Sequence, residues 1–286
     1  MIDIAIIGSG PAGLSAAINA VARGRKPVVY GRSMDTSFLY KAERVDNYLG
    51  MGGLSGEQML KKFKEHATEM NVEIKEGRVL QIMPMGDYFA INFDNEIESA
   101  RAVILTSGIV KGNKIQGEEE FLGRGVSYCA TCDGMLYRGK EVAIVGETHE
   151  AKEDVEFLSK IAGKVHYIPA KGLEMPSSGN VFVHEGKALE VLGGDFVTAL
   201  KTNEGIIDCQ GVFFVKGTMP FDSLVAGIEL DNGMVKVDRL MQTNIAGVFA
   251  AGDCTGWPFQ LSKAVGEGLV AAQQADRYIS GLGLNG

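Results

Sequence analysis

Two cysteines near the middle of the chain have the spacing of a reactive pair. Two residues separate Cys129 from Cys132, and an acidic residue, Asp133, follows directly in the segment Cys-Ala-Thr-Cys-Asp-Gly. A C-x-x-C pair either exchanges electrons as a dithiol and disulfide or supplies two ligands to a metal ion. In the redox case, the carboxyl group of Asp133 is suited to deliver a proton during thiol–disulfide exchange.

The metal alternative needs about four ligands for a structural zinc site, and the rest of the chain does not supply them at a suitable spacing. Cys209 and Cys254 each stand alone, and the four histidines show no ligand-like spacing. We therefore predict a redox dithiol and no metal site. Cys209 and Cys254 are expected to pack as small apolar side chains.

A glycine-rich turn near the start of the chain has the pattern of a dinucleotide-binding site. The segment Gly8-Ser9-Gly10-Pro11-Ala12-Gly13 follows an apolar run, Ile4–Ile7, and precedes the helix-like segment Leu14–Ala22. Glycines in this context permit a tight turn and the close approach of a pyrophosphate to the N-terminus of the helix. We therefore predict cofactor contacts at Gly8, Gly10, Pro11, Ala12 and Gly13.

The end of the next strand departs from that pattern. An acidic residue for the ribose is expected about 20 residues after the glycines, but Tyr30-Gly31-Arg32 stands there. We expect Gly31 and Arg32 at the cofactor, with Arg32 against a phosphate or the adenine. A second candidate contact lies near the end of the chain, where the apolar run Gly247–Ala251 precedes Gly252 and Asp253. A carboxylate at a strand end can bind a polyol chain, although a simple Gly-Asp turn has the same sequence.

These motifs require two strand–turn–helix units to position them. The first opens the chain, and the second comprises a strand over Glu141–Val145, a turn over Gly146–Ala151 and a helix over Val155–Ile161. Apolar periodicity predicts further elements: a helix over Gly56–Asn71, a hairpin over Val79–Phe93 turning at Gly86-Asp87, strands over Ala102–Thr106 and Val165–Ile168, and a helix over Ser262–Ile279.

Polar segments between these elements indicate where one domain gives way to another. Lys111–Lys114 and the acidic run Glu118–Glu120 are interpreted as a solvated linker, and Lys216–Phe221 as a return linker. The domains predicted from this are residues 1–111 with 219–286, and residues 112–218.

Composition narrows the class of protein. The chain has 286 residues, 28 basic against 36 acidic side chains and a net charge of −8, which argues against nucleic-acid binding. No apolar run is long enough to span a membrane, and the N-terminus lacks the features of a signal peptide. We expect a cytoplasmic protein that does not bind membranes. The 38 glycines are about twice the usual share, which indicates many tight turns and close backbone approaches.

Together the three motifs resemble those of the low-molecular-weight flavin thioredoxin reductases. The matching segments are GSGPAG near the start, CATCDG in the middle and GVFAAGD near the end. The resemblance covers essentially the whole chain. It implies an α/β fold with two Rossmann-like, three-layer ββα domains, the second inserted into the first. It also implies FAD in the discontinuous domain, the dithiol in the inserted domain, and a homodimer.

Carried over residue by residue, the resemblance assigns roles to this chain. Cys132 would be the thiol next to the flavin, Cys129 would attack or resolve the substrate disulfide, and Asp133 would be the general acid. Asp253 would bind the ribityl–phosphate region. Other contacts to FAD are implied at Asn47, Val79, Gly108, Gly252, Gln260 and Leu261. Two segments depart from the family pattern: the arginine before Gln260 is missing, and Thr36-Ser37-Phe38-Leu39 replaces the GGQL loop.

The main departure lies in the inserted domain, where family members bind NADPH through G-G-G-x-[ST]-A and an H-R-R-x-x-x-R stretch. This chain has Gly146-Glu147-Thr148-His149-Glu150-Ala151 and Ile168-Pro169-Ala170-Lys171-Gly172 instead. A carboxylate about 4 Å from a phosphate charge costs about 4 kcal/mol at an effective dielectric of 20, or almost a thousandfold in affinity. Glu147 and Glu150 therefore argue against NADPH as the electron donor.

The family contains a ferredoxin-dependent branch without these motifs, and the chain looks like it. Electron transfer from a ferredoxin near −400 mV to thioredoxin near −270 mV is downhill by about 6 kcal/mol for two electrons. The resemblance thus implies thioredoxin as electron acceptor and ferredoxin as donor. Three alternatives stay open: a conventional NADPH-dependent reductase, a flavin dithiol oxidase that uses oxygen, and an FAD-binding redox sensor.

Overall fold

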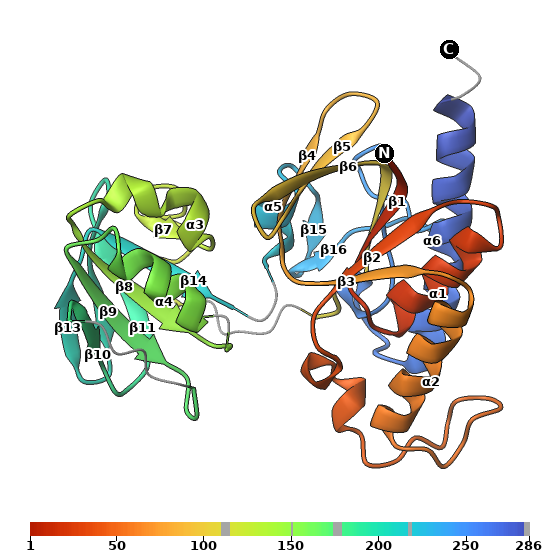
Figure 1. Ribbon diagram of the computed structural model, residues 1–286, viewed down its shortest axis with the longest axis horizontal. Coiled ribbons are helices and arrows are strands. Elements are labelled where there is room, and N and C mark those ends of the chain that lie inside the picture. Colours follow the sequence, from red (N-terminus) through yellow and green to blue (C-terminus); the bar gives the residue numbers. More distant parts are fainter. Residues whose placement is uncertain (110–114, 150, 174–178, 217–218, 283–286) are drawn as a thin grey trace. The chain divides into compact units, whose positions relative to one another are not determined.

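The computed structural model divides the chain into two compact units, both drawn in Figure 1. It describes residues 1–109, 115–149, 151–173, 179–216 and 219–282. The larger unit holds residues 1–110 and 220–286, and the smaller unit, residues 111–219, is inserted between these two segments of the chain.

The larger unit is built on a seven-stranded sheet with the order β3-β2-β1-β6-β5-β4, in which β17 also pairs with β6. Strands β1, β2, β3, β6 and β17 run parallel, whereas β4 and β5 form an antiparallel hairpin against β6. The predicted hairpin is confirmed. The strands are β1 (Ile2–Ile7), β2 (Pro27–Gly31), β3 (Glu73–Glu76), β4 (Val79–Pro84), β5 (Phe89–Phe93), β6 (Glu96–Leu105) and β17 (Val248–Ala250).

Three long helices pack on this sheet. α1 (Pro11–Val21) and α6 (Leu261–Leu282) lie side by side, and α2 (Gly56–Glu69) packs against α1 (Figure 1). Small residues of α1 and α6 permit the close packing, because alanines from both helices share one buried core with β1 and β6. α2 begins at a capping box in which Ser55 and Gln58 bond each other's backbone N–H groups, which satisfies two donors at that end.

Short elements complete the larger unit. They are α5 (Phe221–Leu224), the ribbon β15 (Leu230–Asp231) with β16 (Met234–Val235), and the 3-10 turns η1 (Met34–Thr36), η2 (Leu39–Lys41) and η4 (Asp253–Thr255).

The smaller unit has three layers. Its central sheet, β10-β9-β8-β14-β7, is parallel throughout. Alternate residues of β8 face opposite sides, so Val142 and Ile144 pack with helix α4, whereas Ala143 and Val145 pack with a three-stranded antiparallel sheet. The elements are β7 (Val126–Ser127), α3 (Ala130–Asp133), η3 (Gly134–Tyr137), β8 (Glu141–Gly146), α4 (Ala151–Ser159), β9 (Lys164–Pro169), β10 (Val181–Val183), β11 (Ala188–Gly193), β12 (Val197–Thr202), β13 (Gly205–Asp208) and β14 (Gly211–Val215).

The predicted fold class is confirmed: each unit is a Rossmann-like α/β unit, and the second interrupts the first. One expectation is wrong in part. The acidic run Glu118–Glu120 is not uniformly solvated, because the side chain of Glu118 is 1 % exposed and forms an ion pair with Lys216. Lys216, expected in a return linker, is buried too. Lys111–Lys114 lie outside the described residues.

Candidate active site

The C-x-x-C pair forms a disulfide in the smaller unit. β7 ends at Ser127, and Cys129 then caps the short helix α3, so that the Cys132 N–H donates to Cys129 Sγ at 3.1 Å. The two Sγ atoms are 2.09 Å apart. Cys129 is 8 % exposed, whereas Cys132 is exposed at the surface. The cysteine that the resemblance assigns to attack on, or resolution of, the substrate disulfide is therefore the more buried residue of the two.

Asp133 lies beside this disulfide. Its carboxylate oxygen Oδ2 accepts a hydrogen bond from Ser127 Oγ at 2.7 Å, and its backbone N–H donates to the carbonyl oxygen of Cys129 at 3.2 Å. Ser127 Oγ also accepts the Cys129 N–H at 3.0 Å. The structure therefore brings together the three residues with candidate catalytic roles, and adds Ser127, which sequence reasoning did not single out.

The two remaining cysteines are buried and separate from the pair. Burial raises the pKa of the Cys209 thiol and of the Cys254 thiol to about 12, so neither is a thiolate at neutral pH. Their expected packing as small apolar side chains is confirmed. Within the described part of the chain, no group of three or more His, Cys, Asp or Glu side chains could hold a metal ion.

The glycine-rich turn of the larger unit connects β1 to α1, and its three glycines differ in what surrounds them. A Cβ on Gly8 would lie 2.4 Å from the Thr106 carbonyl oxygen, and one on Gly13 would lie 1.9 Å from that of Gly8. Both positions therefore require glycine for the fold itself. Gly10, by contrast, has no protein atom within 4 Å of such a Cβ. The space beside Gly10 allows a pyrophosphate to come close to the protein backbone. This turn therefore fits the phosphates of FAD.

The N-terminus of α1 supports the same assignment. Pro11 occupies the first turn of α1, and no side chain caps that helix end at Gly10. The first-turn N–H groups of Ala12 and Gly13 have no partner within the helix and are suited to bind an anion.

Other predicted positions lie at the same edge of the parallel sheet. Gly31 ends β2 and packs on Ser9, whose Oγ donates to the Arg32 carbonyl oxygen at 3.3 Å. Gly108 follows β6 with φ +73° and open space beside its Cα. Val79 is buried at the start of β4, three residues after β3 ends.

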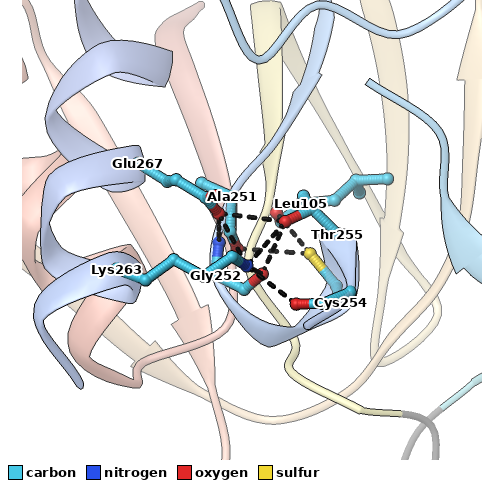
Figure 2. Close-up of polar contacts among 8 residues, drawn as sticks. Leu105, Ala251, Gly252, Cys254, Thr255, Lys263 and Glu267 are labelled. Carbon is cyan, nitrogen blue, oxygen red and sulfur yellow. Dashed lines mark hydrogen bonds and ion pairs between the residues drawn. The ribbon is translucent and has the colours of Figure 1, made fainter. Parts of the chain in front are cut away.

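Gly252 of the Gly-Asp motif also lies at this edge, and Figure 2 shows its polar contacts with Lys263 and Glu267. Gly252 follows β17 with φ +88°, and a Cβ there would lie 2.8 Å from that of Ala12. From α6, Glu267 Oε2 accepts the Gly252 N–H at 2.9 Å, and Lys263 Nζ donates to the Gly252 carbonyl oxygen at 2.8 Å. The C-terminal motif is thus held against the N-terminal glycine turn.

Asp253 follows in this fixed turn. Burial raises the pKa of its carboxyl group, the nearby ammonium of Lys263 opposes that rise, and Glu267 adds to it. A partly buried carboxyl group of this kind can accept hydrogen bonds from the hydroxyls of a polyol chain.

Asn47 and Gln260 meet although 213 positions separate them. Asn47 Nδ2 donates to Gln260 Oε1 at 3.0 Å, and Leu261 begins α6 directly afterwards. The resemblance assigns both amides to one cofactor, and the structure brings them together.

The corresponding turn of the smaller unit has a different chemistry. The exposed Glu147 follows β8, and its N–H donates to the Val215 carbonyl oxygen at 2.9 Å. The next residue after β14, Lys216, places its ammonium 2.5 Å from Glu118 Oε1, which also accepts the Tyr128 hydroxyl at 2.6 Å. The ammonium of Lys216 is therefore buried and neutralised, whereas Lys171, which follows β9 at the same edge, is exposed. Glu150 lies outside the described residues.

Sequence reasoning missed several of these partners. Ser127 directly precedes the Tyr-Cys segment, but a lone serine in a short strand carries no distinct pattern. The Glu118–Lys216 pair joins residues 98 positions apart, a separation that no local pattern reveals. Lys263 and Glu267 are spaced four apart on a predicted helix, a spacing that does signal a charge pair on one face.

Comparisons with known proteins agree with this geometry. Residues 2–268 match the family described as pyridine nucleotide-disulphide oxidoreductase. A thioredoxin reductase of Aquifex aeolicus is 33% identical, with 98% of this chain and 94% of that protein covered.

Two solved structures are also similar. A ferredoxin-flavin thioredoxin reductase from Clostridium acetobutylicum is 44% identical with a TM-score of 0.91, covering 98% of this chain and 97% of the other. A thioredoxin reductase from Gloeobacter violaceus is 32% identical with a TM-score of 0.79, covering 98% and 94%. The chain therefore belongs to the pyridine nucleotide-disulphide oxidoreductase family and, within it, to the thioredoxin reductases, which are flavoprotein disulfide oxidoreductases that bind FAD.

Proposed function

We propose that this protein reduces the disulfide of thioredoxin with electrons from reduced ferredoxin rather than from NADPH. The observation that carries the choice of donor is the buried ion pair between Lys216 and Glu118. Nucleotides bind at the carboxyl edge of a parallel sheet, and Lys216 lies at that edge in the smaller unit. Glu118 neutralises Lys216, and Glu147 adds a carboxylate to the turn. These residues therefore disfavour binding of a phosphate group at this edge.

FAD, when bound, accepts electrons one at a time and supplies two to a disulfide. The chain's own residues would hold it at the carboxyl edge of β1, β2, β6 and β17. We assign cofactor binding to Gly8, Gly10, Pro11, Ala12, Gly13, Gly31, Arg32, Asn47, Val79, Gly108, Gly252, Asp253, Gln260 and Leu261. The larger unit is thus the FAD-binding unit, and the smaller one carries the dithiol.

Once the enzyme dithiol has formed, thiol–disulfide exchange with thioredoxin needs no further reactant. The Cys129 thiolate attacks one sulfur of the thioredoxin disulfide, forming a mixed disulfide and releasing the other sulfur. The Cys132 thiolate next attacks Cys129, which re-forms the enzyme disulfide and frees the thioredoxin dithiol. Two electrons and two protons pass from the enzyme dithiol to thioredoxin, with Asp133 as the group that delivers a proton to the departing sulfur.

The surface beside the disulfide suits a protein substrate. Met135 and Leu136, on η3 directly after the redox segment, are 53% and 68% exposed. Adjacent apolar side chains at the surface next to a reactive disulfide favour docking of another folded protein. Thioredoxin, which presents its own disulfide, is the partner that we propose for this surface.

Two further features are proposed: a homodimer, which the family resemblance implies, and the cytoplasmic location expected from the sequence. In the described part of the chain, no helix has both the length and the apolar character needed to cross a bilayer.

Turnover with purified partners tests the donor and the acceptor together. Under anaerobic conditions, chemically reduced ferredoxin and catalytic amounts of the flavoprotein should convert oxidised thioredoxin to its dithiol. The same mixture with NADPH should give background rates. Rapid turnover with NADPH would instead identify a conventional reductase, and peroxide formation from a small dithiol in air would identify a dithiol oxidase.

A further inference from the structure

Ser127 contacts both the redox disulfide segment and the acid beside it. We propose that Ser127 is a positioning residue for disulfide exchange, because its hydroxyl joins the carboxylate of Asp133 to the backbone of Cys129 (2.7 Å and 3.0 Å). The inference rests on the proposed function only in taking Asp133 as the proton donor of the exchange.

The hydrogen bonds of Ser127 fix which way its proton points. A hydroxyl has one proton to donate and two lone pairs. Ser127 Oγ has two acceptors in reach, Asp133 Oδ2 at 2.7 Å and the Cys129 carbonyl oxygen at 3.2 Å. The shorter contact, to a carboxylate, is the stronger one. The Cys129 N–H occupies a lone pair of the same oxygen.

The backbone of Ser127 is held independently of these contacts. β7 pairs with β14 in parallel register, with Ser127 opposite Phe213. The side chain is buried, with 4 % of the residue exposed. The sheet therefore fixes the hydroxyl, and the hydroxyl in turn fixes the more exposed carboxylate of Asp133.

The hydrogen bond from Ser127 determines which oxygen of Asp133 can carry the proton for transfer. Because Oδ2 accepts the Ser127 proton, a proton that Asp133 delivers is carried on the other oxygen, Oδ1. Without the hydroxyl, the carboxyl group can rotate, and neither oxygen is kept in one place. A proton donor contributes to a rate only when it is within hydrogen-bond reach of the atom that it serves.

The test separates proton delivery from disulfide chemistry through the choice of disulfide. The holoenzyme is reduced anaerobically with dithionite and mixed in single turnover with bis(2-hydroxyethyl) disulfide or with 5,5′-dithiobis(2-nitrobenzoate). The first releases a basic aliphatic thiolate that needs a proton, whereas the second releases a weakly basic aromatic thiolate that does not. Ser127→Ala should slow the first reaction by roughly tenfold and change the second by less than twofold.

A matched pair of variants guards against loss of folding. Ser127→Thr keeps the hydroxyl and Ser127→Val replaces it with a methyl group of nearly the same shape. The Thr variant should restore the rate with the aliphatic disulfide, and the Val variant should not. Parallel slowing of both disulfides, equal rates in Thr and Val variants, or no slowing at all would overturn the proposal, because the hydroxyl would then serve only the fold.

The outcome is independent of the physiological partners. Small disulfides and a chemical reductant replace thioredoxin and ferredoxin, so failure of the proposed donor or acceptor leaves this test intact. In an Asp133→Asn background, Ser127→Ala should lose its selective effect on the aliphatic disulfide, since a residue that acts through Asp133 has nothing left to position.

Discussion

Lys216 and Glu118 form a buried ion pair at the carboxyl edge of the central sheet of the smaller unit. Their side chains are 3% and 1% exposed, and Glu118 also accepts hydrogen bonds from the Tyr128 hydroxyl at 2.6 Å and from the Ile115 N–H at 2.9 Å. Glu118 therefore joins the two ends of the inserted segment, Ile115 at its start and Lys216 near its finish. The same contact removes a positive charge from the place where a phosphate would need one.

Breaking this pair should destabilise the protein strongly. Glu118→Gln leaves the ammonium of Lys216 buried without its ion-pair partner, which costs about 3–5 kcal/mol in comparable pairs. The exposed pair Lys201–Glu190 in the same unit provides the control, since Glu190→Gln should cost no more than about 1 kcal/mol. Urea unfolding of both variants measures the difference, and equal midpoints would contradict the account.

Gly10 offers a test of the FAD assignment that does not disturb the fold. Its φ of −79° suits any residue, and the space beside it is open. Gly10→Val should fold but weaken FAD binding by on the order of a hundredfold, or about 2.8 kcal/mol, as measured by flavin fluorescence on titration of the apoprotein. Gly266→Ala, at an open helical position, should bind FAD normally. Unchanged FAD affinity in Gly10→Val would remove the pyrophosphate from this turn.

Cys132 should be required for catalysis and not for the cofactor. Cys132→Ser is expected to abolish reduction of thioredoxin while the protein keeps its flavin absorbance, because the disulfide belongs to the smaller unit. Cys209→Ala, which removes a buried thiol from the same unit, should remain active. Loss of flavin from Cys132→Ser would contradict the assignment of this cysteine to catalysis alone.

His184 should make stability depend on pH. Burial lowers the pKa of His184, and the neighbouring His166 lowers it further. Glu204 has a smaller opposing effect, and Lys164 contributes a small additional lowering. His166 lies 2.8 Å from it and is backed by Glu141 at 3.3 Å. The native state therefore resists a proton that the unfolded chain accepts near pH 6.5.

The contribution of His184 to the free energy of unfolding is consequently fully present above that pH. It is lost as the pH drops toward the lowered pKa of His184. Thermal unfolding between pH 7 and pH 5 should show this decline in the wild type and a shallower one in His184→Gln. The exposed His66 is the matched control, and His66→Gln should keep the wild-type slope. Identical slopes in all three proteins would exclude His184 as the source.

Local patterns predicted the elements of the fold well, since strands and helices leave a short-range signal. The hairpin over Val79–Phe93, the helix over Gly56–Asn71 and the second strand–turn–helix unit all form within a few residues of their predicted limits. What the sequence could not show is which polar residue meets which. The acidic run Glu118–Glu120 has the composition of a solvated segment, and only its partner Lys216, far along the chain, makes Glu118 a buried residue.

In the candidate site too, local spacing revealed some of the residues and only the fold revealed the others. Spacing alone indicated the Cys129–Cys132 pair and the glycine turn, because each is a local motif with a known chemistry. Ser127 became visible only in three dimensions, since its role depends on hydrogen bonds from β7 to Cys129 and Asp133. The different burial of the two cysteines also depends on that packing, and no feature of C-x-x-C predicts it.

We propose that electrons do not enter this protein from NADPH. The most direct measurement is the visible flavin spectrum of the purified protein under strict anaerobiosis, first with excess NADPH and then with reduced ferredoxin. The account predicts no bleaching with NADPH and rapid bleaching with ferredoxin. Prompt bleaching by NADPH would contradict it, because Glu147 and the Glu118–Lys216 pair would then fail to keep a nucleotide from the smaller unit.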